Sequence, residues 1–179
     1  MNGFEGKVAI VTGAGNGIGL AIAHAFGAKG VSVVVADINA AAGARAATEI
    51  EQAGGQAISV PTDVADEGQV EAMVETVLNR LGRIDILVNN AGIVVHKLLV
   101  ELDRSDWDQQ LAVQLTGPFL TSKHVARHMI ERGGPGKIVN ISSVSAVMGR
   151  IKGGPHCAAK AGLTLLTKVL AMELAQYQI

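Results

Sequence analysis

Short runs of β-branched and aliphatic residues alternate along the chain with longer stretches whose apolar residues recur at helical spacing. This alternation is typical of βαβ units, in which a parallel sheet is covered by helices on both faces. The pattern predicts strands at Val8–Thr12, Ser32–Asp37, Gln56–Val60, Ile84–Asn89 and Lys137–Ser142. It predicts helices at Gly17–Lys29, Ala40–Ala53, Glu67–Leu81, Ser105–Arg132 and from about His156 to Tyr177.

Residues at the helix starts agree with these bounds. Asn39 stands where a cap is expected, Asp66 and Gln69 have the spacing of a capping box, and Pro155 suits the opening of a helix. Parallel crossovers are right-handed, and the strand order is expected to reverse beside the first strand. We therefore predict an α/β fold with a Rossmann-like doubly wound parallel sheet, in one domain over residues 1–179, and a ligand crevice at the carboxyl ends of its strands.

Composition narrows the classes of function. The 179 residues are 49% hydrophobic, 17% charged and 3% aromatic with a net charge of −1, which gives no general attraction to nucleic acid or acidic membranes. Cys157 is the only cysteine, so one chain forms no internal disulfide and no thiolate metal cluster. Neither a signal peptide nor a run of roughly 18 apolar residues is evident. We expect a cytoplasmic protein with small-molecule or protein partners.

A glycine-rich turn follows the first predicted strand. Residues 12–19 read TGAGNGIG and lead directly into the next helix. Glycines let the backbone approach a pyrophosphate, and the helix N-terminus offers free N–H groups to its charge. This pattern indicates a dinucleotide site, with an ordinary tight turn as the alternative interpretation.

Asp37 ends the second predicted strand, about 20 residues beyond the glycine turn. An acid at this place can hydrogen-bond both ribose hydroxyls and repel a 2′-phosphate. No Lys or Arg directly follows Asp37, and Asn16 is uncharged. The residues favour NAD over NADP, and the alternative is that Asp37 merely ends a strand.

Four motifs in order follow predicted strands: TGAGNGIG, Asp63 of PTDV, NNAG at 89–92 and ISS at 141–143. Together they resemble the short-chain dehydrogenase/reductase family over almost the whole chain. The resemblance implies that Asp63 and Val64 contact the adenine and that Asn90–Gly92 lines the adenosine ribose, although Asp63 could instead cap a helix. The full expected cofactor-binding set is Gly13, Asn16, Gly17, Ile18, Gly19, Asp37, Ile38, Asp63, Val64, Asn90, Ala91, Gly92 and Lys160.

The catalytic pattern of that family is matched only in part. Its members use a tyrosine as general acid/base, a lysine that lowers the tyrosine pKa, a serine that orients the substrate oxygen and an asparagine that anchors a water. Ser143 and Lys160 match the serine and the lysine. His156 stands four positions before Lys160, where the tyrosine is expected, and Gln114 of VQLTGPF replaces the asparagine. The stretch GGPHCAAKAG can also be read as one from which a tyrosine after Pro-His was lost.

Two interpretations of His156 stay open. Imidazole titrates at about pH 6.5, and its pKa is expected to fall beside a lysine cation. His156 is therefore either a working acid/base or an ordinary residue at a helix start. No metal site is expected at His156 and Cys157, and His124 and His128 are expected on a solvated helix face.

The resemblance implies an NAD-dependent oxidoreductase that transfers hydride between nicotinamide and a secondary alcohol or ketone. The alternative is a dinucleotide-binding relative, altered or truncated, without turnover. The ending AMELAQYQI resembles the helix that precedes the family's last strands and substrate-covering segment, so those elements are predicted to be absent. The last two long helices resemble the pair that packs against a twofold mate, which predicts a homodimer or homotetramer. Neither nucleic acid nor membrane is an expected partner, and the residues do not name the substrate.

Overall fold

The computed structural model of the protein describes residues 3–179. Its strands are β1 Val8–Thr12, β2 Ser32–Asp37, β3 Gln56–Pro61, β4 Ile86–Asn89 and β5 Lys137–Asn140. Its α-helices are α1 Gly17–Gly27, α2 Ala40–Gln52, α3 Glu67–Leu81, α4 Arg104–Leu111, α5 Gly117–Arg132 and α6 Gly154–Leu174. A π-helical segment, η2 Ala112–Thr116, joins α4 to α5, and short 3-10 turns lie at η1 Leu99–Glu101, η3 Val144–Ala146 and η4 Ala175–Tyr177.

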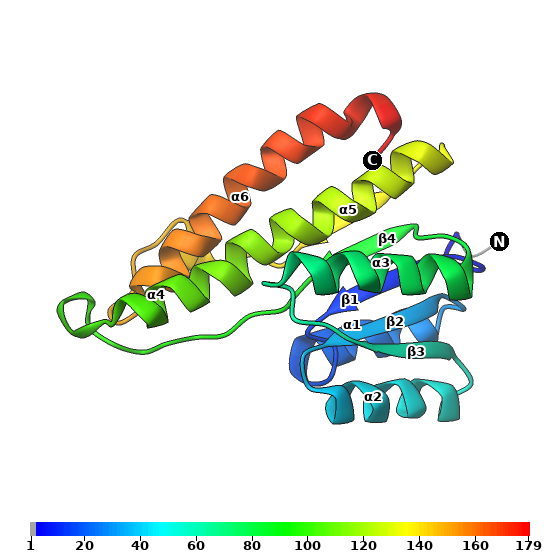
Figure 1. Cartoon of the computed structure of the whole chain (residues 1–179), viewed down its shortest axis with the longest axis horizontal. Coiled ribbons are helices and arrows are strands. Elements are labelled where there is room, and N and C mark those ends of the chain that lie inside the picture. Colours follow the sequence, from blue (N-terminus) through cyan, green and yellow to red (C-terminus); the bar gives the residue numbers. More distant parts are fainter. Residues whose placement is uncertain (1–2) are drawn as a thin grey trace.

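The five strands form one parallel sheet in the order β3-β2-β1-β4-β5. The order reverses beside β1, as the sequence predicts, so the carboxyl ends of β1 and β4 flank the crevice where α/β proteins bind ligands. The chain therefore has the predicted α/β, Rossmann-like fold (Figure 1). Two strands are shorter than predicted, because β4 begins at Ile86 and β5 ends at Asn140.

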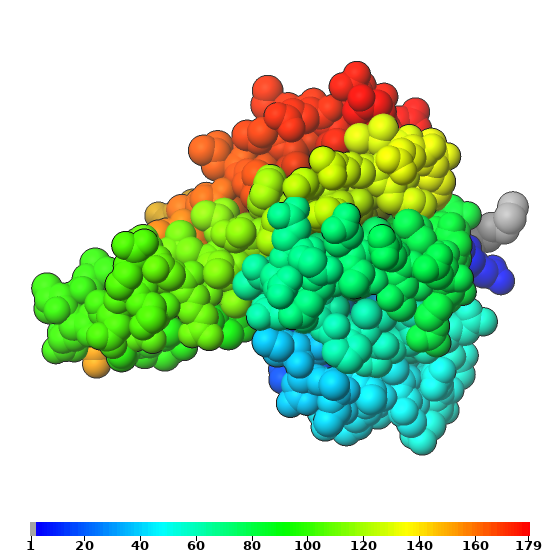
Figure 2. Space-filling model, viewed as in Figure 1, coloured from blue at the N-terminus to red at the C-terminus, as the bar shows by residue number. Residues whose placement is uncertain are grey.

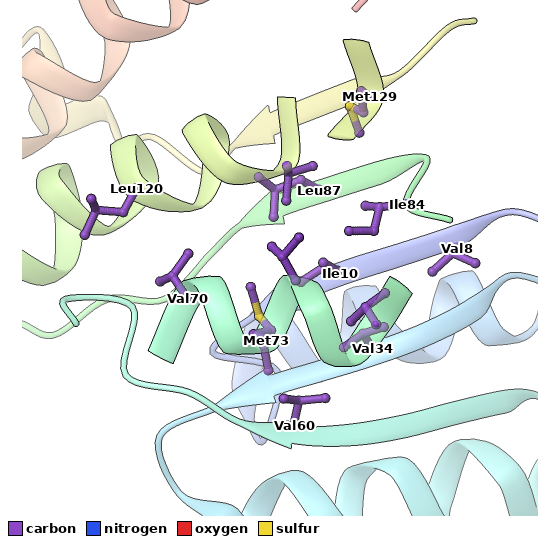
Figure 3. Packing of buried hydrophobic residues seen from close by; sticks show 14 residues of the cluster. Val8, Ile10, Val34, Val60, Val70, Met73, Ile84, Leu87, Leu120 and Met129 are labelled. Atoms are coloured by element: carbon purple, nitrogen blue, oxygen red, sulfur yellow. The ribbon is translucent and has the colours of Figure 1, made fainter. Parts of the chain in front are cut away.

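The core has two layers, one on each face of the sheet. Along β1, Val8 and Ile10 face α3 and α5, whereas Ala9 and Val11 face α1 and α2. This alternation follows from the two-residue period of a strand, and both faces are buried because helices cover both. Figure 3 shows Ile10 packed toward Met73 of α3 in the first layer. Each fully buried aliphatic side chain of this kind stabilises the fold by about 1.5–3 kcal/mol.

The predicted single helix Ser105–Arg132 is interrupted, so that prediction is wrong in one respect. Between α4 and α5 the chain keeps helical dihedral angles but adopts the wider π-helical hydrogen bonding over Ala112–Thr116. Pro118 supplies a physical reason, because it has no N–H to donate to the carbonyl of Gln114 four residues earlier. Single π-turns of this kind often occur at functional sites.

The helices α5 and α6 run side by side, and α4 lies against α6 (Figure 1). In the space-filling view, the segments between β4 and α5 project beyond the sheet at one end of the molecule (Figure 2). None of the helices in residues 3–179 combines the length and apolar character of a membrane-spanning segment.

Local capping largely agrees with the sequence. Asn39 Oδ1 accepts the Ala42 N–H at 3.0 Å, and Asp66 Oδ1 accepts the Gln69 N–H at 3.1 Å. The Gln69 side chain does not close the capping box, however, because its Oε1 accepts the N–H of Asp63 instead. The last helix begins at Gly154, two residues earlier than predicted, with a proline in its first turn.

The prediction that His124 and His128 lie on a solvated helix face is also wrong. His124 is only 10% exposed, and its Nε2 lies 3.1 Å from Glu67 Oε1 on α3. His128 Nε2 accepts the N–H of Ile84 at 3.3 Å, and burial lowers the pKa of this imidazole. Both histidines therefore help to join α5 to the rest of the fold.

Candidate active site

The glycine-rich turn leaves β1 in a conformation that suits glycine. Gly13 and Gly17 have φ angles of +63° and +55° in the left-handed region. A Cβ atom on Gly19 would collide with the carbonyl of Gly13, so α1 packs directly onto the turn. Asn16 precedes α1 without making a side-chain cap. The first N–H groups of α1 are therefore not taken by a capping side chain, as an anion site requires.

Asp37 lies at the carboxyl end of β2 with both carboxylate oxygens held by backbone. Its Oδ2 accepts the N–H of Gly15 at 2.8 Å, and its Oδ1 accepts the N–H of Asn39 at 2.9 Å. The residue is 9% exposed, and a Cβ on Gly15 would come within 2.8 Å of Oδ2. The carboxylate is thereby fixed in orientation and keeps further lone pairs free, since each oxygen accepts more than one hydrogen bond.

One cation near this turn was missed by the sequence reasoning. Arg45 on α2 donates from Nη2 to the carbonyl of Gly15 at 3.4 Å, and its Nε lies 3.5 Å from Glu49 Oε1. The only signal in the sequence was its place one helical turn into α2. Its pairing with Glu49 reduces the positive charge that it presents to a ligand.

A cavity of about 460 Å³ opens between these elements, within the size range of small-molecule sites. Its lining contains the following predicted residues: Gly13, Asn16, Ile18, Asp37, Ile38, Asp63, Val64, Asn90, Ala91 and Gly92. Gly17, Gly19 and Lys160 do not line it. Six further lining residues were not predicted, although two of them lie inside the motifs PTDV and VQLTGPF: Thr62, Ala65, Ile93, Gln109, Ala112 and Val113.

Hydrogen bonds of Thr12 and Asn90 join the end of β1 to the segment that follows β4. Thr12 Oγ1 accepts the N–H groups of Asn90 at 3.0 Å and of Ala91 at 3.1 Å. In return, Asn90 Nδ2 donates to the carbonyls of Thr12 at 3.0 Å and Gly13 at 3.1 Å. These bonds hold the glycine turn against the segment after β4. We call Gly13, Asp37, Asp63 and Asn90 the dinucleotide region.

A buried polar network lies beside this region. Asn89 Nδ2 donates to Ser122 Oγ at 3.1 Å and to Asn140 Oδ1 at 2.8 Å, while its Oδ1 accepts the hydroxyl of Thr121 at 2.6 Å. Asn140 continues the network to Thr167 on α6. The network joins β4 and β5 to α5 and α6, and sequence reasoning, which treated Asn89 as part of a turn motif, did not find it.

Lys160 and Ser143 lie at the ends of α6 and β5 that approach each other. Lys160 is 6% exposed, its Nζ donates to the carbonyl of Ile141 at 2.6 Å, and burial lowers the pKa of its ammonium group. Ser143 Oγ accepts the N–H of Ser145 at 3.1 Å and caps η3. The η3 turn packs against α6, which brings these two predicted residues to the same end of the sheet.

Gln114 and His156 are hydrogen-bonded to each other. Gln114 is 2% exposed on η2, and its Oε1 lies 2.9 Å from His156 Nδ1 at the start of α6. The amide nitrogen of Gln114 donates to the carbonyl of Ile93. Burial, followed by the charge of Lys160 and of Arg150, lowers the pKa of His156. We call Gln114, Ser143, His156 and Lys160 the catalytic region.

The family model described as short chain dehydrogenase matches residues 7–179. The chain belongs to this family. It is 42% identical over 175 residues to an uncharacterized oxidoreductase of Thermotoga maritima, covering 98% of this chain and 68% of the relative. It is 43% identical over 177 residues to the 3-oxoacyl-[acyl-carrier-protein] reductase of Synechocystis, covering 98% and 71%.

Solved structures of the same family superpose closely. A short-chain dehydrogenase/reductase from Burkholderia phymatum in complex with NAD has a TM-score of 0.95 at 33% identity, covering 98% of this chain and 63% of that one. One from Mycobacterium marinum has a TM-score of 0.96 at 36% identity, covering 98% and 70%. The chain therefore spans about two thirds of the length of these relatives.

The dinucleotide region of this short-chain dehydrogenase fits the cofactor class that the fold implies. A glycine-rich turn stands before an uncapped helix N-terminus, and a fixed carboxylate stands at the next strand end. Gln114 and His156, the two positions where the sequence predicts a departure from the family pattern, contact each other. Residues 3–179 contain no group of three His, Cys, Asp or Glu side chains arranged for a metal ion.

Proposed function

We propose that this chain forms the NAD-binding and catalytic part of an oxidoreductase that acts on a secondary alcohol or ketone. The observation that carries the proposal is the Asp37 carboxylate, fixed by two backbone N–H groups at the wall of the cavity. Its free lone pairs suit the two hydroxyls of an adenosine ribose. Its negative charge disfavours the 2′-phosphate of NADP, and the nearby Arg45 is paired with Glu49.

The residues have distinct roles in this proposal. The uncapped N-terminus of α1 binds the pyrophosphate, and Asp37 binds the ribose. Bound NAD supplies the hydride acceptor or donor. Lys160 contributes positive charge, the Ser143 hydroxyl orients the substrate oxygen, and His156 holds or releases the proton of that oxygen.

Calorimetric titration of the chain with NADH and NADPH tests the cofactor assignment. We expect micromolar NADH binding and at least about tenfold weaker NADPH binding, because one fixed charge opposes the extra phosphate. Asp37→Ser should bring the two affinities together. The matched control is Asp63→Asn, which removes a second carboxylate from the same cavity wall and should leave the ratio unchanged. Equal affinities in the unmodified chain, or no binding of either, would contradict the proposal.

A second function is favoured by one observation. Ser143, His156 and Lys160 do not line the cavity that contains the dinucleotide region. A protein that binds NADH without turnover fits this separation. If the chain binds NADH but reduces no NAD with a panel of secondary alcohols, this second function is supported and the first is not.

A further inference from the structure

The contact between Gln114 and His156 assigns a chemical state to the imidazole. The carbonyl of Ile93 can only accept a hydrogen bond, so the atom of the Gln114 amide that faces it is the NH₂ group. The amide oxygen is then the atom that faces His156 Nδ1 at 2.9 Å. Because an amide oxygen only accepts, Nδ1 carries the hydrogen. In a neutral imidazole the other nitrogen, Nε2, is then unprotonated.

The surroundings make this arrangement well defined. Gln114 is buried on η2, where the π-turn turns its side chain between the segment after β4 and the start of α6. A second glutamine one turn earlier, Gln110, holds the same segment through the N–H of Val95 at 3.1 Å. Within residues 3–179, Nε2 of His156 makes no hydrogen bond. The lone pair of Nε2 is therefore free to meet a substrate.

We propose that Gln114 is a positioning residue that holds His156 in the Nδ1-protonated tautomer, so that its Nε2 accepts a proton from a substrate hydroxyl. The groups that face His156 are Lys160 on α6, Arg150 before α6 and His96 after β4, which itself lies 3.2 Å from the Arg150 guanidinium. All three are cationic or neutral. They favour an uncharged imidazole, which is the form that can act as a base.

The chemical step rests on the proposed function. When a secondary alcohol is oxidised, its O–H bond breaks and the proton passes to His156 Nε2. The C–H electron pair leaves as hydride to NAD⁺, which is reduced, and the carbon–oxygen double bond forms. The imidazolium then releases its proton to water. With Nε2 unprotonated at neutral pH, the site is built for alcohol oxidation, and the reverse reaction requires a prior protonation of His156.

Long-range ¹H–¹⁵N NMR of the full chain, without cofactor, tests the tautomer directly. The His156→Ala spectrum identifies the His156 signals. We expect the wild-type ring to show Nδ1 protonated and Nε2 unprotonated. Gln114→Leu removes the acceptor, so both tautomers should appear. Gln110→Leu is the matched control, since it removes a buried glutamine at the end of α4, one turn before Gln114, that does not touch His156, and it should keep the wild-type pattern.

A second variant keeps the proposal testable if Gln114→Leu fails to fold. Gln114→Glu retains the size and places a carboxylate beside Nδ1, which should raise the pKa of His156 by at least about one unit. The same NMR signals, followed against pH, measure this shift. A wild-type ring protonated on Nε2, or a pKa unaffected by Gln114→Glu, would overturn the proposal.

The outcomes separate this inference from the proposed function. An Nδ1-protonated ring in a chain that binds no NADH supports the role of Gln114 and removes the dinucleotide function. In a chain that binds NADH and oxidises a secondary alcohol, His156→Ala should slow the reaction by about 100-fold or more. An unchanged rate, or binding without turnover in the wild type, would remove the base role of His156.

Discussion

The dinucleotide region and the catalytic region differ in the groups that form their hydrogen bonds. In the first, backbone groups form one side of each hydrogen bond: N–H groups hold Asp37, carbonyls accept from the side-chain amide of Asn90, and glycines leave space at the turn. In the second, side chains from separate elements meet, as Gln114 and His156 do. A site made by the backbone depends on space and turn geometry, whereas one made by paired side chains depends on both partners.

The comparison predicts that the largest effects come from crowding the glycine turn. Gly19→Ala should cost about 3 kcal/mol or more of stability and abolish NADH binding, because its Cβ would overlap the Gly13 carbonyl and the chain must shift. Gly17→Ala is the control: its φ of +55° costs about 1–2 kcal/mol, but its Cβ meets nothing within 4 Å. Urea unfolding and calorimetry measure both. Normal NADH affinity in Gly19→Ala would contradict the backbone description.

The adjacent residues Asn89 and Asn90 distinguish the buried polar network from the dinucleotide region beside it. Asn89→Ala should lower the free energy of unfolding by about 2 kcal/mol, because buried partners on α5 and β5 lose their hydrogen bonds. It should leave NADH affinity nearly unchanged. Asn90→Ala should instead weaken NADH binding, since the turn at Gly13 loses its support. If the two variants behaved alike, the polar network and the dinucleotide region would not be independent.

The sequence predicted well what depends on local backbone geometry. The bounds of β1 and β2, the reversal of strand order beside β1, and the cap at Asn39 follow from period, turn residues and capping preference. It predicted poorly what depends on contacts between distant elements. The contacts of His124 and His128, the Asn89 network and the Gln114–His156 bond join positions 27 or more residues apart, and no rule of local sequence spacing covers such distances. The π-turn was missed although Pro118, its physical reason, stands in the sequence.

Asp85 lies just before β4, at the end of the sheet away from both regions, and its stability effect can be compared with theirs. Asp85 is 3% exposed; burial acts to raise its pKa, but the guanidinium of Arg83, the N–H of Val8 and the ammonium of Lys7 lower it to about 2. The unfolded chain, with the usual value of 3.8, binds more protons below that pH. About 2 kcal/mol of stability is therefore present above pH 4 and lost as the pH falls toward 2.

Acid unfolding of the wild type and of Asp85→Asn checks this linkage. The variant should be less stable at neutral pH, and its stability should change less between pH 4 and pH 2 than that of the wild type. Because Asp85 touches neither region, the variant should bind NADH at neutral pH with the wild-type affinity. A weaker affinity in Asp85→Asn would show that the two ends of the sheet are coupled.

The smallest expected effect lies closest to the cofactor-selecting residue. Asn39→Ala removes the side-chain cap of α2 and should lower stability by about 1 kcal/mol, whereas Asn39→Asp, which can still accept the Ala42 N–H, should not. The bond that orients Asp37 comes from the backbone N–H of Asn39 and survives both changes. The ratio of NADH to NADPH affinity should therefore stay at the wild-type value in both variants. If the preference for NADH over NADPH fell in Asn39→Ala alone, the Asn39 side chain rather than its backbone N–H would orient the Asp37 carboxylate. The dinucleotide region would then depend on a side chain, as the catalytic region does.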